Sequence, residues 1–217
     1  MNIEKARFNM IEQQVKPWKV FDERLLGAMA IIPREQFVPE GHRNLAYADM
    51  HIPIGHNQSM LAPREVARMI QALALTGNEK VLEIGCGSGY SSALLSKLAR
   101  KVYSVDIFAD FVNESRQKLS RLAFENVVLE EVDAAQGWLA NAPYDAILIS
   151  SLLPALPESM SRSLSLNGRI VAVLGSLESQ MVTLCQLDEN GEWRYSDLFP
   201  IRTEPMVNAE QPNRFKF

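Results

Sequence analysis

The chain has 217 residues, of which 47% are hydrophobic, and a formal net charge of −4 at pH 7. This size and composition predict a single globular α/β domain, and the acidic balance argues against a nucleic-acid-binding surface. Two cysteines are too few for a disulfide framework, no apolar run is long enough to span a membrane, and charged residues interrupt the first apolar ones where a secretory signal would be continuous. We therefore expect a soluble cytoplasmic protein.

The first 78 residues predict two helices separated by an irregular segment. Asp22 can cap a helix that carries Leu25, Leu26, Met29 and Ala30 and ends before Pro33. A second helix is expected to begin at Pro63, because proline is favoured at the first helical position. Residues 33–63 are rich in Pro, Gly, His and Asn and show no sustained period. Long irregular segments of this kind are usually functional or mobile.

From Lys80 onward, short apolar strands alternate with helices. Strands are expected at 81–84, 102–105, 127–132, 146–149 and 169–174, and helices at 90–98, 111–122 and 156–164. The alternation predicts right-handed crossovers and a doubly wound, mostly parallel sheet. Residues 181–187 and 193–198 flank the turn Asp188-Glu189-Asn190-Gly191, which indicates a hairpin that completes seven strands.

The motif Gly85-Cys86-Gly87-Ser88-Gly89 follows the first of these strands and precedes a helix. Alternating glycines let the backbone approach a ligand without Cβ clashes, and the amides at the helix start attract a negative group. Asp106 ends the next strand, where a carboxylate can accept hydrogen bonds from ribose hydroxyls. The motif thus predicts a nucleoside-containing cofactor.

Two other interpretations of the glycine loop fit the sequence less well. A dinucleotide-binding fingerprint would place Tyr90 at its third glycine, so the spacing and the long extension before the strand favour S-adenosyl-L-methionine over a nicotinamide cofactor. A glycine turn that merely joins strand to helix would leave the alternating glycines and Asp106 unexplained.

These segments resemble class I methyltransferases, whose fold is a Rossmann-like seven-stranded sheet. Residues 81–90 resemble motif I, residues 102–107 the acidic strand after it, residues 143–149 motif II and residues 166–171 motif III. More narrowly, the chain resembles protein-L-isoaspartate O-methyltransferases to about residue 182. This likeness rests on residues 32–39, 46–49, 52–55, 137–138, 142–145 and 173–175, with the nearby Gln180.

The resemblance implies a set of cofactor-binding residues. Glu83, Gly85, Cys86 and Gly87 are expected to line the methionine part of S-adenosyl-L-methionine, Asp106 the ribose, and Asp133 with Ala134 the adenine. Ser88, Ile107 and Ser150 complete the expected site, with the Ser150 hydroxyl beside the reacting methyl group.

The acceptor segment departs from the family pattern. The family reads roughly Gly-Gln-Thr-Ile-Ser-x-Pro where this chain has residues 57–63. Gln58 and Ser59 are the expected catalytic residues, and Leu61 stands at the position of the family serine without its hydroxyl. Because a carboxylate acceptor is already ionised near neutral pH, the missing hydroxyl would act by positioning, worth about 1.5–3 kcal/mol. Glu204 replaces an apolar residue and would repel an acidic acceptor if it faces the site.

The implied function is carboxyl methylation of L-isoaspartyl residues in damaged proteins or peptides, which is a protein-repair reaction. A family member with another acceptor, a weakly catalytic cofactor-binding interaction module and a nucleotide-linked dehydrogenase stay open as alternatives. Expected partners are a peptide or protein carboxylate, without nucleic acid or membrane, for a monomer or weak homodimer. The spacing of His42, His51 and His56 suggests no metal site. Residues 1–78 are expected as lid and acceptor-side segment of one domain that spans 1–217, residues 79–217 as its cofactor-binding sheet, and residues 47–63 as a mobile lid outside the core.

Overall fold

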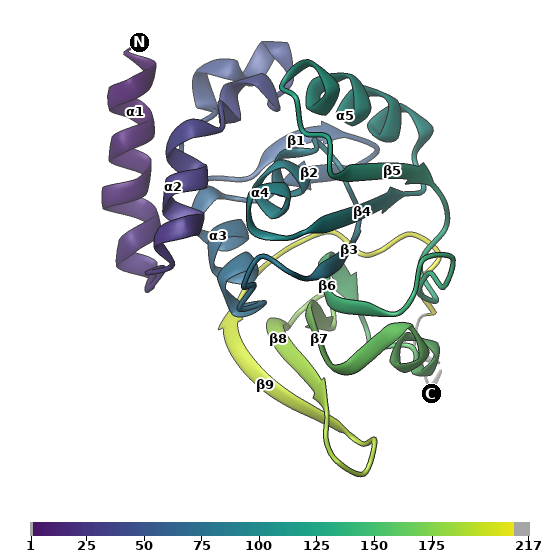
Figure 1. Cartoon of the computed structure of the whole chain (residues 1–217). Helices are drawn as coiled ribbons and strands as arrows, with labels where there is room; N and C mark the ends of the chain where they lie inside the picture. The colour runs from purple at the N-terminus through teal and green to yellow at the C-terminus, as the bar shows by residue number, and fades with distance from the viewer. Residues whose placement is uncertain (1, 211–217) are drawn as a thin grey trace, which may run out of the picture.

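The computed structural model describes residues 2–210 and contains a seven-stranded sheet of order β5-β4-β3-β6-β7-β8-β9 (Figure 1). Its strands are β3 Lys80–Ile84, β4 Lys101–Asp106, β5 Val127–Glu131, β6 Tyr144–Leu153, β7 Leu164–Gly175, β8 Gln180–Leu187 and β9 Trp193–Pro200. Strands β3 to β7 pair in parallel, and β8 and β9 are antiparallel additions at one edge. The mostly parallel doubly wound sheet and the Asn190-Gly191 hairpin are confirmed.

The central strands are buried on both faces, as expected for a parallel sheet. Val81 and Ala146 pack in one core with residues of three helices, α3 Pro63–Ala72, α4 Tyr90–Leu98 and α5 Ala109–Arg121. Their neighbours Leu82 and Ile147 point to the opposite face, where Trp138 and the 3₁₀ turn η5 Glu158–Ser163 cover them. The prediction of a helix at 156–164 is wrong, because only this 3₁₀ turn forms there. It follows two prolines, Pro154 and Pro157, which cannot donate a backbone hydrogen bond.

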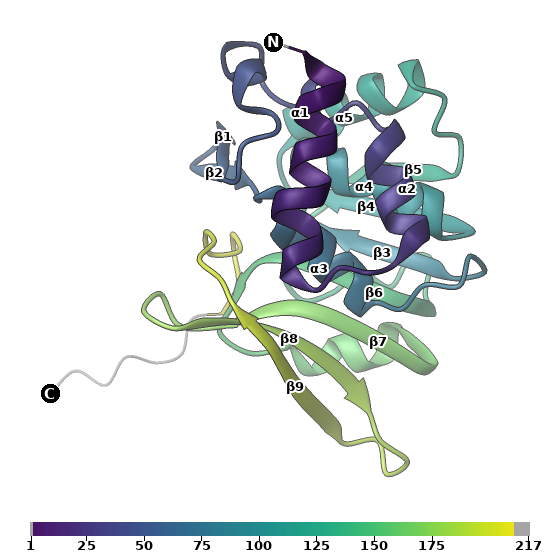
Figure 2. The same cartoon turned by 90° about the vertical axis from the view of Figure 1, so that its left-hand side faces the viewer.

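The N-terminal segment adds helices outside the sheet. Helix α1 Ile3–Met10 continues into a π turn, Ile11–Val15, and a 3₁₀ turn, Lys16–Trp18, and lies beside α2 Glu23–Ile31 (Figure 2). As predicted, the carboxylate of Asp22 caps α2, accepting hydrogen bonds from the amides of Arg24 and Leu25. The sequence pattern did not predict α1.

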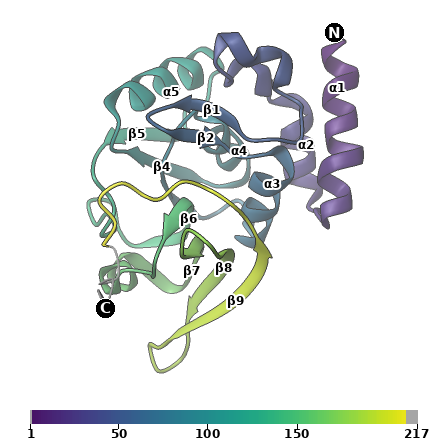
Figure 3. The same cartoon turned by 180° about the vertical axis from the view of Figure 1, so that it is seen from behind.

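Residues 33–63 are more ordered than their composition suggests. They form two 3₁₀ turns, η3 Arg34–Gln36 and η4 Glu40–Leu45, and a small antiparallel hairpin of β1 Ile52–Gly55 and β2 Gln58–Met60. The hairpin lies next to α5 (Figure 3). Its turn residues His56 and Asn57 both have positive φ, +51° and +53°, typical of a tight hairpin turn.

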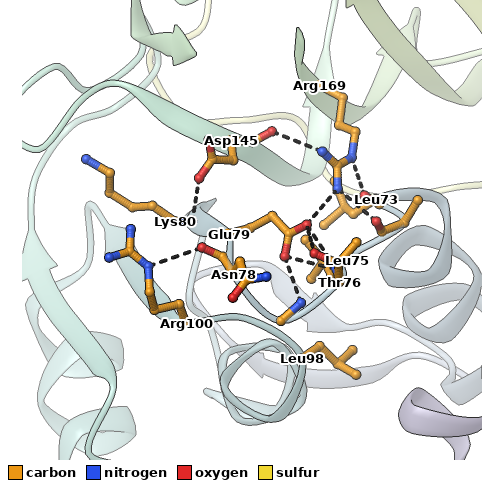
Figure 4. A network of polar contacts seen from close by, with 12 residues as sticks. Leu73, Leu75, Thr76, Asn78, Glu79, Lys80, Leu98, Arg100, Asp145 and Arg169 are labelled. Carbon is orange, nitrogen blue, oxygen red and sulfur yellow. Dashed lines mark hydrogen bonds and ion pairs between the residues drawn. The ribbon is translucent and has the colours of Figure 1, made fainter. Parts of the chain in front are cut away.

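A polar network fastens the chain after α3 to the sheet at the amino ends of the strands (Figure 4). Arg169 donates to the carbonyls of Leu73 and Ala74 at the end of α3 and lies 3.6 Å from Glu79. Although burial favours the neutral acid, hydrogen bonds from Thr76 and Gly77 lower the pKa of Glu79 to about 2. The network thus stabilises the fold at the sheet end opposite the glycine loop. No helix within residues 2–210 is long and apolar enough to cross a membrane.

Candidate functional site

The glycine loop follows β3 at the carboxyl edge of the sheet. The amides of Gly85 and Cys86 donate to the carbonyl of Val105, 2.8 and 3.2 Å away, which ties the loop to the neighbouring strand β4. Gly87 has φ +46°, and a Cβ there would lie 3.1 Å from Cδ1 of Ile54 in the hairpin. The loop therefore leaves space beside bare backbone that a side chain would fill.

Asp106 joins this loop to the next helix. Its carboxylate accepts hydrogen bonds from the Gly87 amide at 2.9 Å and from the Phe108 amide at 3.1 Å. Each carboxylate oxygen keeps a lone pair for a ligand, because an ionised carboxylate offers about four acceptor sites. Asp106 is thus held at the floor of a cleft by backbone groups on both sides.

Two adjoining cavities open at this edge of the sheet and, with their solvent-filled mouths, measure about 610 and 460 Å³. Among the predicted site residues, the larger cavity is lined by Gln58, Ser59, Gly85, Gly87, Asp106, Ile107, Asp133, Ala134 and Ser150. The smaller is lined by Leu61, Cys86 and Ser88, and it shares Ser59, Gly85, Gly87 and Ser150 with the larger one. The structure therefore brings together residues that are far apart in the chain, and Ser59 stands where the two cavities meet.

Glu83 is the exception, because it lines neither cavity. Its side chain is 1% exposed and accepts hydrogen bonds from Ser92 and Ser104 on the helix-covered side of the sheet. Burial raises the pKa of this carboxyl group. As the residue before Ile84 in β3, Glu83 points toward α4 and supports the loop from beneath, so a contact with the ligand stays a prediction.

Cys86 is a small filler of the glycine loop. It is buried beside the smaller cavity, and burial raises the pKa of its thiol well above the usual value. Such a thiol stays protonated near neutral pH and is a poor nucleophile. Its role is therefore steric.

The acceptor-side segment is partly core, which corrects the expectation of a lid outside it. Ile52, Met60 and Leu61 all belong to the core cluster that includes α3 and α4. Their side chains anchor the hairpin, whose exposed residues are Pro53 and the turn Gly55-His56-Asn57.

Leu61 forms an apolar wall of the smaller cavity together with Met60, Val66 and Met69. The side chain is 7% exposed, and its carbonyl accepts a hydrogen bond of 2.7 Å from Nη2 of Arg34. Arg34 is fully buried, also donates to the Ala46 carbonyl, and has no partner for Nη1. Sequence reasoning assigned no role to Arg34, although it stands in a family-like stretch.

An aromatic side of the larger cavity was also missed. Phe108 and Phe111 line it just after Asp106, together with Ile54 from the hairpin. The ring of His56 stacks on Phe108 with centroids 4.0 Å apart, and its Nε2 lies 2.7 Å from Oδ2 of Asp110. The hairpin turn is thus fastened to the start of α5, directly over the cavity. The sequence signal for this aromatic side was the apolar pair Ile107-Phe108, which directly follows Asp106.

A strap, residues 203–208, closes the remaining side of the larger cavity. It runs between the hairpin and the ends of β6 and β7, as the yellow segment beyond β9 in Figure 3. The backbone of Leu152 bonds to Glu204 and Met206, each at 2.9 Å. Asn208 donates to Asp133 at 2.7 Å, and the Ser59 hydroxyl donates to Oε1 of Glu204 at 2.8 Å. Glu204 lines neither cavity itself, but its carboxylate contacts Ser59, which lines both, so repulsion of an acidic acceptor is expected there.

Comparison with known proteins places this site in a family. Residues 5–211 match the model of the protein-L-isoaspartate(D-aspartate) O-methyltransferase family. The chain belongs to this family. A protein-L-isoaspartate O-methyltransferase 2 from Pelobacter propionicus is 39% identical over 96% of this chain and 93% of its own length. One from Rhodopseudomonas palustris is 39% identical over 93% of each chain.

Solved structures agree with the fold of this family member. A protein-L-isoaspartate O-methyltransferase superposes with a TM-score of 0.79 at 23% identity, covering 93% of this chain and 65% of that one. A β-aspartate methyltransferase structure from Plasmodium falciparum, in complex with S-adenosyl-L-homocysteine, gives a TM-score of 0.78 at 19% identity, covering 96% and 100%. These likenesses establish the Rossmann-like methyltransferase fold.

Proposed function

We propose that this chain methylates the free carboxylate of L-isoaspartyl residues in damaged proteins and peptides, with S-adenosyl-L-methionine as the methyl donor. Family membership supports the reaction, and the observation that carries it in this structure is the position of Ser59. Ser59 lines both the cavity that contains Asp106 and the adjoining cavity. An acceptor and a donor can therefore meet beside this side chain.

The larger cavity fits the donor. Gly87 leaves room where a Cβ would contact Ile54, and the Asp106 carboxylate keeps free acceptor sites for ribose hydroxyls. Asp133 and Ala134 line the same cavity where the adenine is expected, and Ser150 lies where the cavities join. When bound, S-adenosyl-L-methionine supplies an electrophilic methyl group on a positively charged sulfur.

The chain's own residues then have to bind, orient and desolvate the acceptor. A carboxylate with an ordinary pKa near 4 is ionised at neutral pH, so no general base is required. Gln58 and Ser59 are proposed to orient the carboxylate, and the apolar wall that includes Leu61 and Met60 excludes water from it. The relatives reported above give no support to a different acceptor.

The test is transfer of labelled methyl groups to an L-isoaspartyl peptide, with the aspartyl peptide of the same sequence as control. Transfer to the isoaspartyl peptide alone is expected. Equal transfer to both peptides, or transfer to neither by protein that binds S-adenosyl-L-homocysteine, contradicts the proposal.

We also propose a cytoplasmic location. The two buried free thiols, Cys86 and Cys185, support it.

A further inference from the structure

Glu204 brings a negative charge to the acceptor side of the site. The strap backbone fixes its position, because the Glu204 carbonyl accepts from the Leu152 amide at 2.9 Å and the neighbouring Thr203 hydroxyl donates to the Ser150 carbonyl at 3.2 Å. Oε1 accepts the Ser59 hydroxyl at 2.8 Å. The Ser59 hydroxyl therefore connects this carboxylate to the point where the two cavities meet.

No cation of the described chain pairs with this carboxylate. Across residues 2–210, Glu204 forms no ion pair within 4.0 Å, and its second oxygen meets only the Thr203 hydroxyl at 3.5 Å. His51 is within electrostatic reach, but its Nε2 is bonded to Glu65 at 2.5 Å. Arg34 donates from Nε and Nη2 to two backbone carbonyls and forms no ion pair with Glu204. The charge of Glu204 is thus left for a ligand to compensate.

An acceptor carboxylate delivered beside Ser59 would meet this charge at short range. Two like charges a few ångströms apart in a half-buried site repel strongly, and specificity commonly arises from such a repulsive element. The Ser59 hydroxyl has a single hydrogen, which it donates to Glu204 in this structure, so Glu204 and the acceptor carboxylate compete for it. A cation next to the acceptor carboxylate would relieve the repulsion.

We propose that Glu204 is a specificity-determining residue that selects isoaspartyl acceptors with a lysine or arginine beside the carboxylate to be methylated. The inference rests on the proposed function for its substrate and on the Ser59–Glu204 contact for its charge preference. A peptide with an acidic neighbour would add a third negative charge and bind worst.

The experiment uses three isoaspartyl peptides that differ only in the residue after the isoaspartate, which is Lys, Gln or Glu. For the wild type, KM for the Lys peptide should be at least about tenfold below that for the Glu peptide, with kcat nearly equal. Glu204→Gln keeps an oxygen that accepts from Ser59 but removes the charge, so it should reduce the ratio to about threefold or less. Glu178→Gln removes an exposed charge from the β7–β8 turn and should keep the wild-type ratio.

Failure of the inference and failure of the proposed function give different results. Equal KM values for the Lys and Glu peptides in the wild type, or an unchanged ratio in Glu204→Gln, would overturn the role of Glu204. If the wild type methylates none of the peptides, the proposed function fails. Calorimetric binding of the same peptides to protein saturated with S-adenosyl-L-homocysteine then decides the charge preference: a preference lost in Glu204→Gln supports it, and equal affinities overturn it.

Discussion

The carboxylate of Asp106 accepts the amide hydrogen of Gly87 at 2.9 Å, so the acidic end of β4 is joined directly to the glycine loop after β3. The ribose-binding group and the backbone that lies along the ligand are therefore positioned together, before any ligand arrives.

Asp106→Ala should weaken S-adenosyl-L-homocysteine binding by about 2–4 kcal/mol, because one or two hydrogen bonds to a charged group are lost. Titration calorimetry measures the change, and circular dichroism checks that the variant stays folded. Glu114→Ala, an exposed acid on α5, serves as the control and should bind like the wild type. Unchanged affinity in Asp106→Ala would remove the ribose assignment.

Leu61→Ser should raise turnover on isoaspartyl peptides by up to about a hundredfold if acceptor positioning limits the rate. The same change removes a buried apolar side chain, so we also expect it to lower the free energy of unfolding by about 2–4 kcal/mol. Leu61→Ala is the matched control, since it loses the same packing without gaining a hydroxyl. Initial rates at saturating cofactor separate the two effects. Ser and Ala variants with the same rate would contradict a positioning role for the hydroxyl.

His56→Asn should release the hairpin turn from α5. Asparagine tolerates the positive φ at this position, but it cannot stack on Phe108 as the imidazole does. We expect dissociation of S-adenosyl-L-homocysteine to become about three- to tenfold faster and proteolytic cleavage in the turn to increase in the free protein. His42→Asn, in the 3₁₀ turn η4, is the control. The wild-type dissociation rate in His56→Asn would show that the stacked contact does not hold the ligand.

Stability should fall in acid because of Glu79. Its pKa is lowered in the folded protein to about 2, below the value near 4.5 of the unfolded chain. The stabilisation is therefore complete above about pH 4.5 and is lost as the pH falls toward 2, and it amounts to at most about 3 kcal/mol. Urea unfolding of the wild type and Glu79→Gln across this range tests it: the difference between them should shrink as the pH falls. A difference that stays constant would mean that Glu79 acts through its shape rather than its charge.

The sequence predicted the features that depend on short stretches of chain. The strand before Gly85 and the acidic end of the next strand at Asp106 are local patterns, because a short apolar run and the spacing of glycines can be recognised in consecutive residues. Helix α1 was not predicted, since charged residues interrupt its apolar ones and its stability comes from packing against the segments that follow it.

Contacts between distant residues were not predictable in this way. The burial of Leu61 depends on Arg34 and on the α3 residues around it, so a segment that looked like an exposed loop is partly core. The Ser59–Glu204 hydrogen bond joins positions 145 residues apart. Only the folded sheet, which brings the end of β6 beside the strap, shows that Glu204 lies against Ser59. The sequence pattern left that orientation undecided.

The strap also sets the order in which the site can be completed. Its residues close the cavity against Asp133, Ser150 and Leu152, all of which are made much earlier in synthesis. A domain generally folds as a unit. Until the strap has been made and has docked, the pocket therefore lacks one wall. A newly made chain should become able to retain its ligand only after the residues beyond about 200 are free to dock.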